Sequence, residues 1–171
     1  MPVLLQKARV FWPLLLLLVL ADCATKRWAE AHLTGQTSEP VAGDVVRWTL
    51  AYNQVGAMGL HIGSATRPVF VLATIIALIV LARLYYTAGA RDKGLAAATA
   101  LIMGGALGNL IDRVRWNGGV IDFIDIGIGT FRFWVFNVAD MGVTTGAALL
   151  GWLMWRQEKR ASSLPPARIT R

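Results

Sequence analysis

Cysteine and histidine are scarce in this sequence, which has one cysteine, Cys23, and two histidines, His32 and His61, among 171 residues. A single cysteine can form no intrachain disulfide and no cysteine-rich metal site. The two histidines are isolated, and the chain has no Ser-His-Asp arrangement, glycine-rich phosphate loop or zinc-ligand spacing. The sequence therefore supports neither a metal site nor the common nucleophilic hydrolases, and we expect no cofactor.

Charged residues are also few, at 16%, whereas hydrophobic residues make up 56% and the mean hydropathy is +0.53. These values lie outside the usual range of soluble domains and indicate an integral membrane protein. The net charge of +7 would suggest nucleic acid in a soluble protein. Here the basic residues cluster at the ends of apolar segments, where they orient helices, so we expect no nucleic-acid partner.

Four apolar segments have about the 17–25 residues that a membrane-spanning helix needs. They cover roughly residues 10–31, 69–88, 94–111 and 136–155. The third is the weakest because alanine and glycine dominate it, yet it carries no charge before Asp112. We expect an all-α membrane protein of four transmembrane helices, with residues 1–155 as one domain and 156–171 as a disordered basic tail.

The lysines and arginines predict the orientation, since they accumulate on the cytoplasmic side. With four spans, ten would lie on the side of the termini: Lys7, Arg9, Arg83, Arg91, Lys93, Arg156, Lys159, Arg160, Arg168 and Arg171. Seven would lie on the other side: Lys26, Arg27, Arg47, Arg67, Arg113, Arg115 and Arg132. Both termini should be cytoplasmic. Most acidic residues fall on the outer side, where we expect the chemistry.

Two outer segments have the pattern of strands rather than of simple loops. Residues 45–53, VVRWTLAYN, are rich in strand-forming residues and lie between Gly43 and Gly56. Residues 113–135 contain a turn signal at 117–119 and then a partly alternating pattern. A small β-like platform, or cradle, on the outer surface is therefore expected.

Polar residues at membrane depth are functional candidates by default. Asp22 and Lys26 are four residues apart, so they share a helix face and can pair. Asn109 and Asp112 are three apart at the outer end of the third span, and the same spacing recurs at the start of the fourth span, in Asn137 and Asp140. All three pairs should meet near the outer membrane boundary.

Small residues at intervals of four occur in the third span, at Gly104 and Gly108, and in the fourth, at Gly142 and Gly146. They would let these two helices approach closely and bring Asp112 near Asp140. Packing alone is the simpler explanation for such a pattern.

Asp122 and Asp125 lie in VIDFID, between the polar ends of the third and fourth spans. The apolar neighbours Ile121 and Phe123 could press Asp122 onto the interface and raise its pKa by desolvation. An extended segment would direct Asp122 and Asp125 to opposite faces, whereas a helical turn would direct them to one. The sequence leaves both conformations open.

Two neighbouring aspartates cannot both be ionised, so they share a proton and can act as base and acid toward water and an amide. Aspartyl proteolysis is the chemistry that fits these residue types. The alternative is that the polar groups only form a hydrogen-bond network at helix ends. A small transporter or proton conductor could also use intramembrane aspartates, but here they gather at one interface and do not follow a path across the bilayer.

The N-terminal stretch LLLLLVLADCATKRWA, residues 14–29, can also be read as an export signal that ends at a lipid-modified Cys23. Asp22 would be a poor residue before such a cysteine, and three further spans follow. We interpret the stretch as an uncleaved first helix.

Five segments together resemble the lipoprotein signal peptidases (signal peptidase II): DCATK, TLAYN, GGALGNLIDR, VIDFID and FNVAD, in this order between about residues 10 and 155. The resemblance implies a four-helix aspartyl protease of the bacterial inner membrane. Such an enzyme cuts prolipoproteins just before a diacylglyceryl-modified cysteine, at a site near the outer face and among membrane phospholipids. We expect a monomer.

The resemblance also implies roles for individual residues. Asp122 and Asp140 would be the catalytic pair, and Asp125 a bystander. Asp22 and Lys26 would be a structural polar pair. The site would be lined by Asn53, Asn109, Asp112, Arg113 and Asn137. One carboxylate would activate water while the other, protonated, polarises the carbonyl and protonates the leaving amine; which one holds the proton at rest belongs to the pair.

The family's outer cradle and interfacial helix agree with the interpretation of residues 45–60. Three positions depart from the family pattern: Val55 stands where glycine is common, Met58 where phenylalanine is common, and Gly119 where histidine is frequent. The first two affect the expected conformation of the loop that covers the substrate. None of the three removes a catalytic carboxylate.

Overall fold

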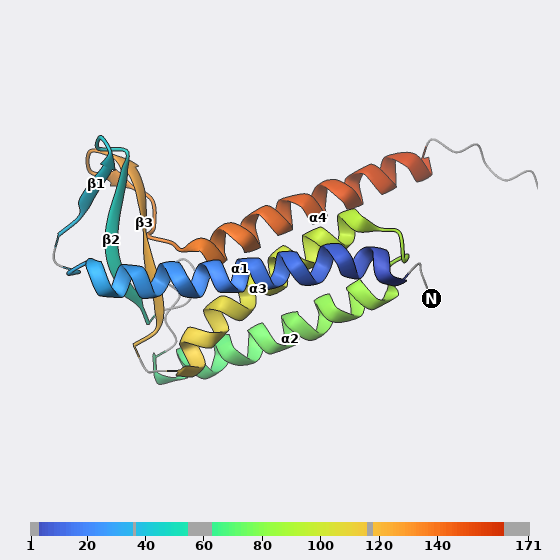
Figure 1. The fold of residues 1–171 in the computed structure, drawn as a ribbon, viewed down its shortest axis with the longest axis horizontal. Coiled ribbons are helices and arrows are strands. Elements are labelled where there is room, and N and C mark those ends of the chain that lie inside the picture. The colour runs from blue at the N-terminus through green and yellow to red at the C-terminus, as the bar shows by residue number, and fades with distance from the viewer. Residues whose placement is uncertain (1–3, 36, 55–62, 116–117, 163–171) are drawn as a thin grey trace, which may run out of the picture.

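Four long helices lie side by side, and a small sheet crosses one end of them (Figure 1). The computed structural model describes residues 4–35, 37–54, 63–115 and 118–162. The helices are α1 (Leu4–His32), α2 (Thr66–Thr87), α3 (Lys93–Arg115) and α4 (Val138–Ser162), and a short 3-10 turn, η2 (Gly63–Ala65), precedes α2. The strands are β1 (Glu39–Ala42), β2 (Val46–Asn53), β3 (Val120–Ile128) and β4 (Phe131–Arg132).

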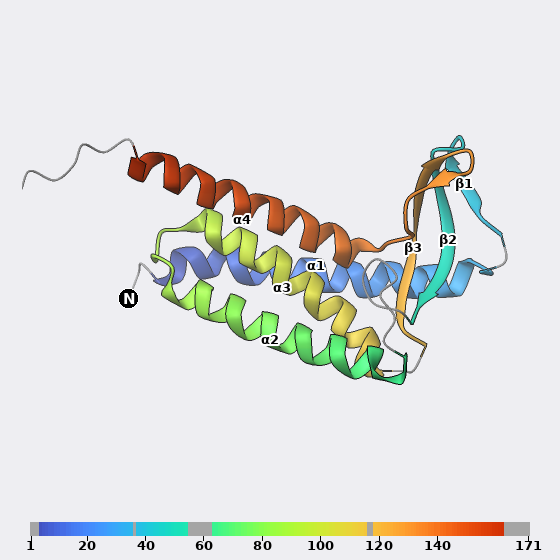
Figure 2. The same ribbon diagram turned by 180° about the vertical axis from the view of Figure 1, so that it is seen from behind.

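The sheet lies where α1 and α3 end and α4 begins, which we call the sheet end of the molecule. The first turn of α1 and the last turn of α4 lie at the opposite end. Figure 2 shows the same two ends from behind, with α3 lying between α1, α2 and α4. Polar residues that lie late in the first and third helices and early in the fourth therefore share one level.

Among the described residues, α1, α2 and α3 are long and apolar enough to cross a membrane. The third segment, expected to be the weakest, thus qualifies. The fourth helix is not among them, because its first half contains Asp140, Gly142 and Gly146 among its apolar residues. The helix bounds differ from the expected spans by a few residues, as helix ends commonly do.

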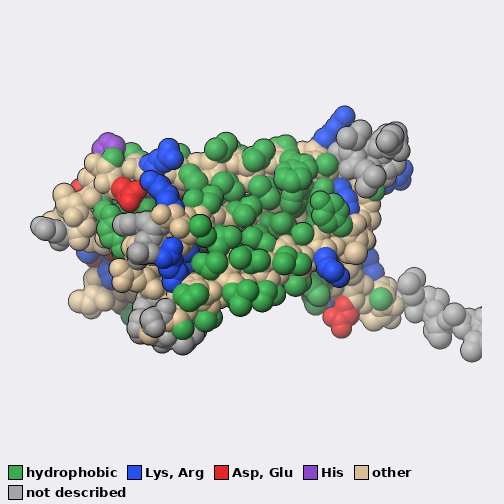
Figure 3. Space-filling view, turned by 90° about the horizontal axis from the view of Figure 1, so that it is seen from below, with side chains coloured by type: hydrophobic (Ala, Val, Ile, Leu, Met, Phe, Trp, Pro, Cys, Tyr) green, Lys and Arg blue, Asp and Glu red, His purple; other side chains and the backbone are tan. Residues whose placement is uncertain are grey.

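An apolar belt surrounds the helices. Leu17 and Leu20 of α1 and Ile79 of α2 are 65%, 66% and 55% exposed. Figure 3 shows hydrophobic side chains covering the middle of one face, with lysines and arginines toward both ends. So large an apolar surface is unfavourable in water but matches the interior of a bilayer, and the flanking cations match its polar boundaries.

The sheet is antiparallel, in the order β1-β2-β3-β4. Its strands confirm the extended structure expected for residues 45–53 and for the segment after the turn signal in the sequence. Ala51 of β2 is paired with Asp122 of β3, and Asn53 is paired with Val120. The strands cross the ends of the helices (Figure 1), and β2 and β3 carry Asn53 and Asp122. Val55 and Met58 lie outside the described residues.

Glycines allow α3 to approach its neighbours, although the pairing differs from the one expected. A Cβ at Gly105 would meet the Ala139 carbonyl of α4, and a Cβ at Gly146 would lie 2.8 Å from the Ala98 carbonyl oxygen of α3. The close contact between α3 and α4 therefore depends on Gly105 and Gly146.

Gly104 and Gly142 both face Leu18 of α1. The prediction that Gly104 belongs to the contact between α3 and α4 was wrong for this reason: α1 packs across both helices and needs space on each.

Residues 156–162 belong to α4, so the expectation of a disordered tail from residue 156 was wrong for this part. Arg156 lies 4.6 Å from the ring centroid of Trp152, and Lys159 lies 4.3 Å from that of Trp155. These cation–π contacts, and basic side chains near a helix C-terminus, stabilise the final turns. Residues 163–171 lie outside the described part of the chain.

Lys7 has a structural role that its position in the sequence does not reveal. Its side chain is buried, and Nζ donates to the carbonyl oxygens of Tyr85 at 2.7 Å and Ala88 at 3.0 Å. Carbonyls at a helix C-terminus lack partners within the helix, and a lysine can satisfy them. Lys7 thereby ties the first turns of α1 to the end of α2.

Candidate active site

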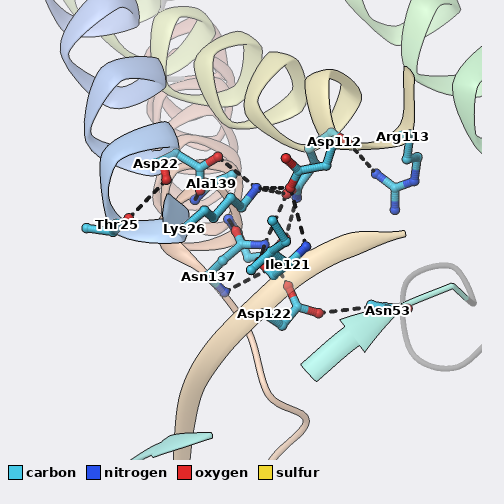
Figure 4. A network of polar contacts seen from close by, with 12 residues as sticks. Asp22, Thr25, Lys26, Asn53, Asp112, Arg113, Ile121, Asp122, Asn137 and Ala139 are labelled. Carbon is cyan, nitrogen blue, oxygen red and sulfur yellow. Dashed lines mark hydrogen bonds and ion pairs between the residues drawn. The ribbon is translucent and has the colours of Figure 1, made fainter. Parts of the chain in front are cut away.

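A cavity of about 220 Å³ opens at the sheet end between α2, α3, α4 and the sheet. It is lined by Asn53, Thr74, Ala106, Asn109, Arg113, Val120, Asp122, Asp140 and Val143. Five of the residues singled out from the sequence thus meet on one surface: Asn53, Asn109, Arg113, Asp122 and Asp140. Asp22, Lys26, Asp112 and Asn137 do not line the cavity but lie behind it, in the network of Figure 4.

Asp122 is a buried carboxyl group on β3, only 3% exposed. The side-chain amide of Asn53 donates to its Oδ2 at 3.1 Å, and that of Asn137 donates to its Oδ1 at 2.6 Å. Burial raises the pKa of Asp122 to about 7, and the negative charge of Asp140 adds to the rise, while the two amides and Lys26 oppose it. The direction is the one expected from the apolar neighbours of Asp122.

Asp140 lies in the first turn of α4, in a reciprocal cap. Its backbone N–H donates to Oδ1 of Asn137 at 3.0 Å, and its Oδ2 accepts the backbone N–H of Asn137 at 3.1 Å. This is the arrangement of a capping box, with asparagine as the N-cap. The amide of Asn109 donates to the other oxygen, Oδ1, at 2.8 Å.

The fourth segment was expected to be helical from residue 136, but Phe136 forms a bridge with Ile124 of β3 and α4 begins at Val138. An asparagine at the N-cap has non-helical backbone angles, so Asn137 is part of the connection between the sheet and α4. Asn137 and Asp140 therefore pair through the helix cap and not as two residues on one helix face. The amide of Asn137 faces the sheet, where it donates to Asp122.

The two asparagine amides join the two carboxyl groups. Nδ2 of Asn137 donates to Oδ1 of Asn109 at 3.0 Å, as well as to Asp122. Asn109 in turn donates to Asp140. A continuous hydrogen-bond chain thus runs from Asp122 through Asn137 and Asn109 to Asp140.

Lys26 binds the expected partner and two others. Its Nζ lies 2.7 Å from Oδ2 of Asp22, 2.8 Å from Oδ2 of Asp112 and 2.9 Å from Oδ1 of Asn109. Asp112 also accepts the backbone N–H of Ile121 at 3.3 Å. Asp112 is turned toward Lys26, so it is Asp122 that lines the cavity with Asp140. The close approach of Asp112 and Asp140 stays a prediction.

The choice between an extended and a helical VIDFID segment is resolved, since residues 120–128 form β3. Asp122 faces the asparagines, whereas Asp125 accepts from Nε of Arg132 at 2.8 Å and from the Thr49 hydroxyl at 3.2 Å. Successive residues of a strand alternate between its faces, so these two carboxylates serve different surroundings.

Asn53 and Arg113 supply polar groups at the mouth of the cavity. Among the described residues, Oδ1 of Asn53 is buried and accepts no hydrogen bond. Arg113 donates from Nη1 to the Asn109 carbonyl oxygen at 3.3 Å, and its guanidinium lies 5.5 Å from the ring centroid of Phe70. The cavity therefore offers an unused acceptor and a cation beside two carboxyl groups.

Two contributors were not found from the sequence. Thr74 of α2 lines the cavity, and its hydroxyl interrupts an otherwise apolar segment, which is the signal that could have revealed it. Ala139 contributes only its backbone N–H, which donates to Oδ1 of Asp22 at 2.9 Å, and no side-chain pattern reveals such a bond.

Comparison with known proteins gives consistent results. The family model described as signal peptidase (SPase) II matches residues 14–156. The lipoprotein signal peptidase of Halothermothrix orenii is 39% identical over 146 residues, which are 84% of this chain and 94% of that protein. The lipoprotein signal peptidase of Geobacter sulfurreducens is 38% identical over 153 residues, 89% and 95% of the two chains. A solved structure of a bacterial membrane enzyme superposes with a TM-score of 0.76 and 30% identity, covering 92% of each chain.

Proposed function

This chain belongs to the signal peptidase II family, and we propose that it acts as an aspartyl protease with Asp122 and Asp140 as its catalytic pair. Its activity is the removal of signal peptides from prolipoproteins in a bacterial inner membrane. The observation that carries the aspartyl mechanism is that both carboxyl groups line one cavity at the sheet end of the helices. The scissile bond is the one just before the diacylglyceryl-modified cysteine.

The same proposal includes a fourth span. In it α4 crosses the bilayer beside α3, both termini are cytoplasmic, and the sheet end with its cavity faces outward. The support is geometric: α4 is 25 residues long, packs on α3 through glycines, and ends in Trp152 and Trp155 with Lys159 and Arg160, the residue types of a membrane boundary.

Asp122 is the protonated member of the pair below pH 7, because its pKa is raised to about 7. Asp140 is the base of this proposal, since its two oxygens accept N–H groups from Asn109 and Asn137 and it lines the cavity beside Asp122. A water in the cavity passes a proton to Asp140 while its oxygen attacks the peptide carbonyl.

Asp122 donates a hydrogen bond to the carbonyl oxygen as negative charge develops there. It then passes its proton to the nitrogen of the breaking C–N bond, and the carbonyl re-forms as the carboxyl end of the signal peptide. Asp122 is left ionised and Asp140 protonated, so transfer of one proton between them restores the resting pair. No proton is gained or lost over the cycle.

The asparagines hold these groups in place. Asn109 and Asn137 orient the two carboxyl groups through the hydrogen bonds described above, and the unused Oδ1 of Asn53 accepts a backbone N–H of the substrate. The acyl chains on the substrate cysteine keep the scissile bond near the membrane boundary, so burial of these chains contributes to recognition.

The test is cleavage of a lipid-modified prolipoprotein by purified protein with Asp122→Asn or Asp140→Asn. Either change keeps the shape and size of the side chain but removes a titrating group, so turnover should be abolished while the protein remains folded. Asp125→Asn is the matched control, because Asp125 lies on the same strand but is bound to Arg132. Near-normal turnover of Asp122→Asn contradicts the proposal.

The proton-conducting alternative required carboxylates along a path through the helices. Asp22, Asp112, Asp122 and Asp140 instead belong to one network at the sheet end. Proton flux into liposomes that is lost with Asp140→Asn would be the result in favour of that alternative.

A further inference from the structure

Lys26 is a buried cation that the proposed mechanism does not use. Its side chain is 3% exposed, and it does not line the cavity. Its three hydrogen-bond and ion-pair partners, Asp22, Asp112 and Asn109, lie 2.7–2.9 Å from Nζ. An ammonium has three N–H bonds and no acceptor, so these three oxygens complete its shell.

Each carboxylate partner of Lys26 also holds the backbone next to one of the two catalytic aspartates. Asp22 accepts the N–H of Ala139, which precedes Asp140, at 2.9 Å. Asp112 accepts the N–H of Ile121, which precedes Asp122, at 3.3 Å. Figure 4 shows Lys26 between Asp22 and Asp112, with Ala139 and Ile121 beside them.

The third partner, Asn109, contacts the dyad through its side chain. Because an ammonium can only donate, the amide oxygen of Asn109 must face Lys26, which turns Nδ2 toward Oδ1 of Asp140 at 2.8 Å. A reversed amide would present its oxygen to Asp140 and repel the carboxylate. The ammonium thus selects one of the two amide orientations.

We propose that Lys26 is a positioning residue that sets the separation of the two catalytic carboxyl groups and fixes the amide orientation of Asn109. A simple ion pair on α1 would need only Asp22. Here one buried ammonium joins α1, α3, the backbone of β3 and the first turn of α4, and every connection ends at or beside Asp122 or Asp140. The inference rests on the proposed function of these two residues.

The charge of Lys26 has a separate, measurable effect. Asp122 is influenced by Asp140 from α4, by Lys26 from α1 and by Arg113 from α3, and Asp112 of α3 binds the neighbouring backbone. Lys26 lowers the pKa of Asp122, against burial and against Asp140. Removing the ammonium should therefore raise the pH at which Asp122 loses its proton.

The experiment compares Lys26→Met with Lys7→Met in purified, folded protein, using a lipid-modified prolipoprotein as substrate. Lys7 is the matched control, since it is also a buried α1 lysine with a hydrogen-bonded Nζ, but at the far end of the helix. For Lys26→Met we expect kcat to fall on the order of 100-fold, the size typical of slightly misplaced catalytic groups. KM should be nearly unchanged, and the alkaline limb of the pH profile should move upward.

Lys7→Met should lower the melting temperature without moving the pH profile. If Lys26→Met does not fold, the double variant Asp22→Asn/Lys26→Met is used in its place. It removes both charges of the Asp22–Lys26 pair and keeps a side-chain oxygen that can accept the N–H of Ala139. The fall in kcat should persist in this variant. Unchanged kcat in the folded Lys26 variant, or in the double variant, overturns the inference. The inference rests on a wild-type protein that cleaves the substrate and an Asp122→Asn variant that does not. Measuring these two proteins first shows a failure of the proposed function separately from a failure of the inference about Lys26.

Discussion

Asp122 and Asp140 carry the same functional group in different surroundings. Asp122 lies on a strand, is buried, and depends on two asparagine amides for hydrogen bonds. Asp140 lies in the first turn of α4 and accepts a backbone N–H together with the amide of Asn109. Burial favours the neutral form of Asp122. This difference in surroundings is the reason we propose Asp122 as the acid and Asp140 as the base.

The activity should therefore be lost as the pH rises through about 7. The folded-state pKa of Asp122 is raised from 3.8 to about 7, so Asp122 holds its proton below that pH and releases it above. The pH profile of kcat/KM, which reports groups of the free enzyme, should show an alkaline limb near pH 7. Activity that stays constant to pH 9 contradicts this assignment.

The same shift predicts the sign of a stability effect. A carboxyl group with a raised pKa binds its proton more tightly in the folded state, so its contribution to folding is complete below the unfolded pKa and is lost as pH rises through the folded one. Recovery of activity when the enzyme is returned from pH 8 to pH 6 is the control that separates titration from irreversible unfolding.

At the scale of elements, the approach of α4 to α3 determines where Asp140 lies. Gly146 faces Ile102 and the carbonyl of Ala98, and an added Cβ would come within 2.7 Å of the Ile102 side chain. Backbone carbonyls cannot move away as a flexible side chain can, so this contact requires glycine. The N-cap Asn137 then fixes the first turn of the helix against the sheet.

Gly146→Ala should lower the free energy of unfolding by about 1–3 kcal/mol, the usual cost of overpacking. Gly151→Ala is the matched control on the same helix, because a Cβ there meets nothing within 4 Å. It should be neutral or stabilise the protein by up to about 1 kcal/mol, since alanine is the better helix former. Thermal unfolding in detergent measures both, and equal effects of the two changes contradict the proposed contact.

At the scale of the whole molecule, the sheet covers one end of the helices, and the first and last helical turns lie at the other (Figure 1). The cavity with Asp122 and Asp140 lies beneath the sheet. The apolar belt of Figure 3 fits a bilayer between these two ends. Under the proposed function, a prolipoprotein held in the membrane by its acyl chains would bring its cysteine to the level of the cavity.

The proposed orientation predicts that a C-terminal fusion to a green fluorescent protein is fluorescent, whereas a C-terminal alkaline phosphatase is inactive, since the first folds in the cytoplasm and the second outside it. This expectation follows from the basic residues, because ten of the seventeen lysines and arginines lie on the side of the termini and such residues accumulate in the cytoplasm. An alkaline phosphatase inserted after residue 43, between β1 and β2, serves as the outer control and should be active. The reverse pattern contradicts both the orientation and the outward site.

Local patterns were sufficient for much of the molecule. Apolar length located the helices, strand-forming residues located β2, and spacing of four predicted the Asp22–Lys26 pair that forms at 2.7 Å. The conformation of VIDFID, which forms β3, stayed open at the sequence level. Spacing could not show that α4 starts after Asn137, because a cap and a helical residue have the same separation from Asp140. It also could not separate Gly104 from Gly105, since adjacent glycines face different helices.

The sequence by itself determined that the chain is a membrane protein, roughly where its long helices lie, and which family it resembles, because hydropathy, residue preference and motif order are properties of neighbouring residues. Only the tertiary structure decided which oxygens surround Lys26 and that Asp122, not Asp112, faces the cavity with Asp140. Lys26 and Asn109 are 83 residues apart, and their contact depends on how three helices and a strand pack at one end. Such packing is a property of the assembled chain and of no single segment.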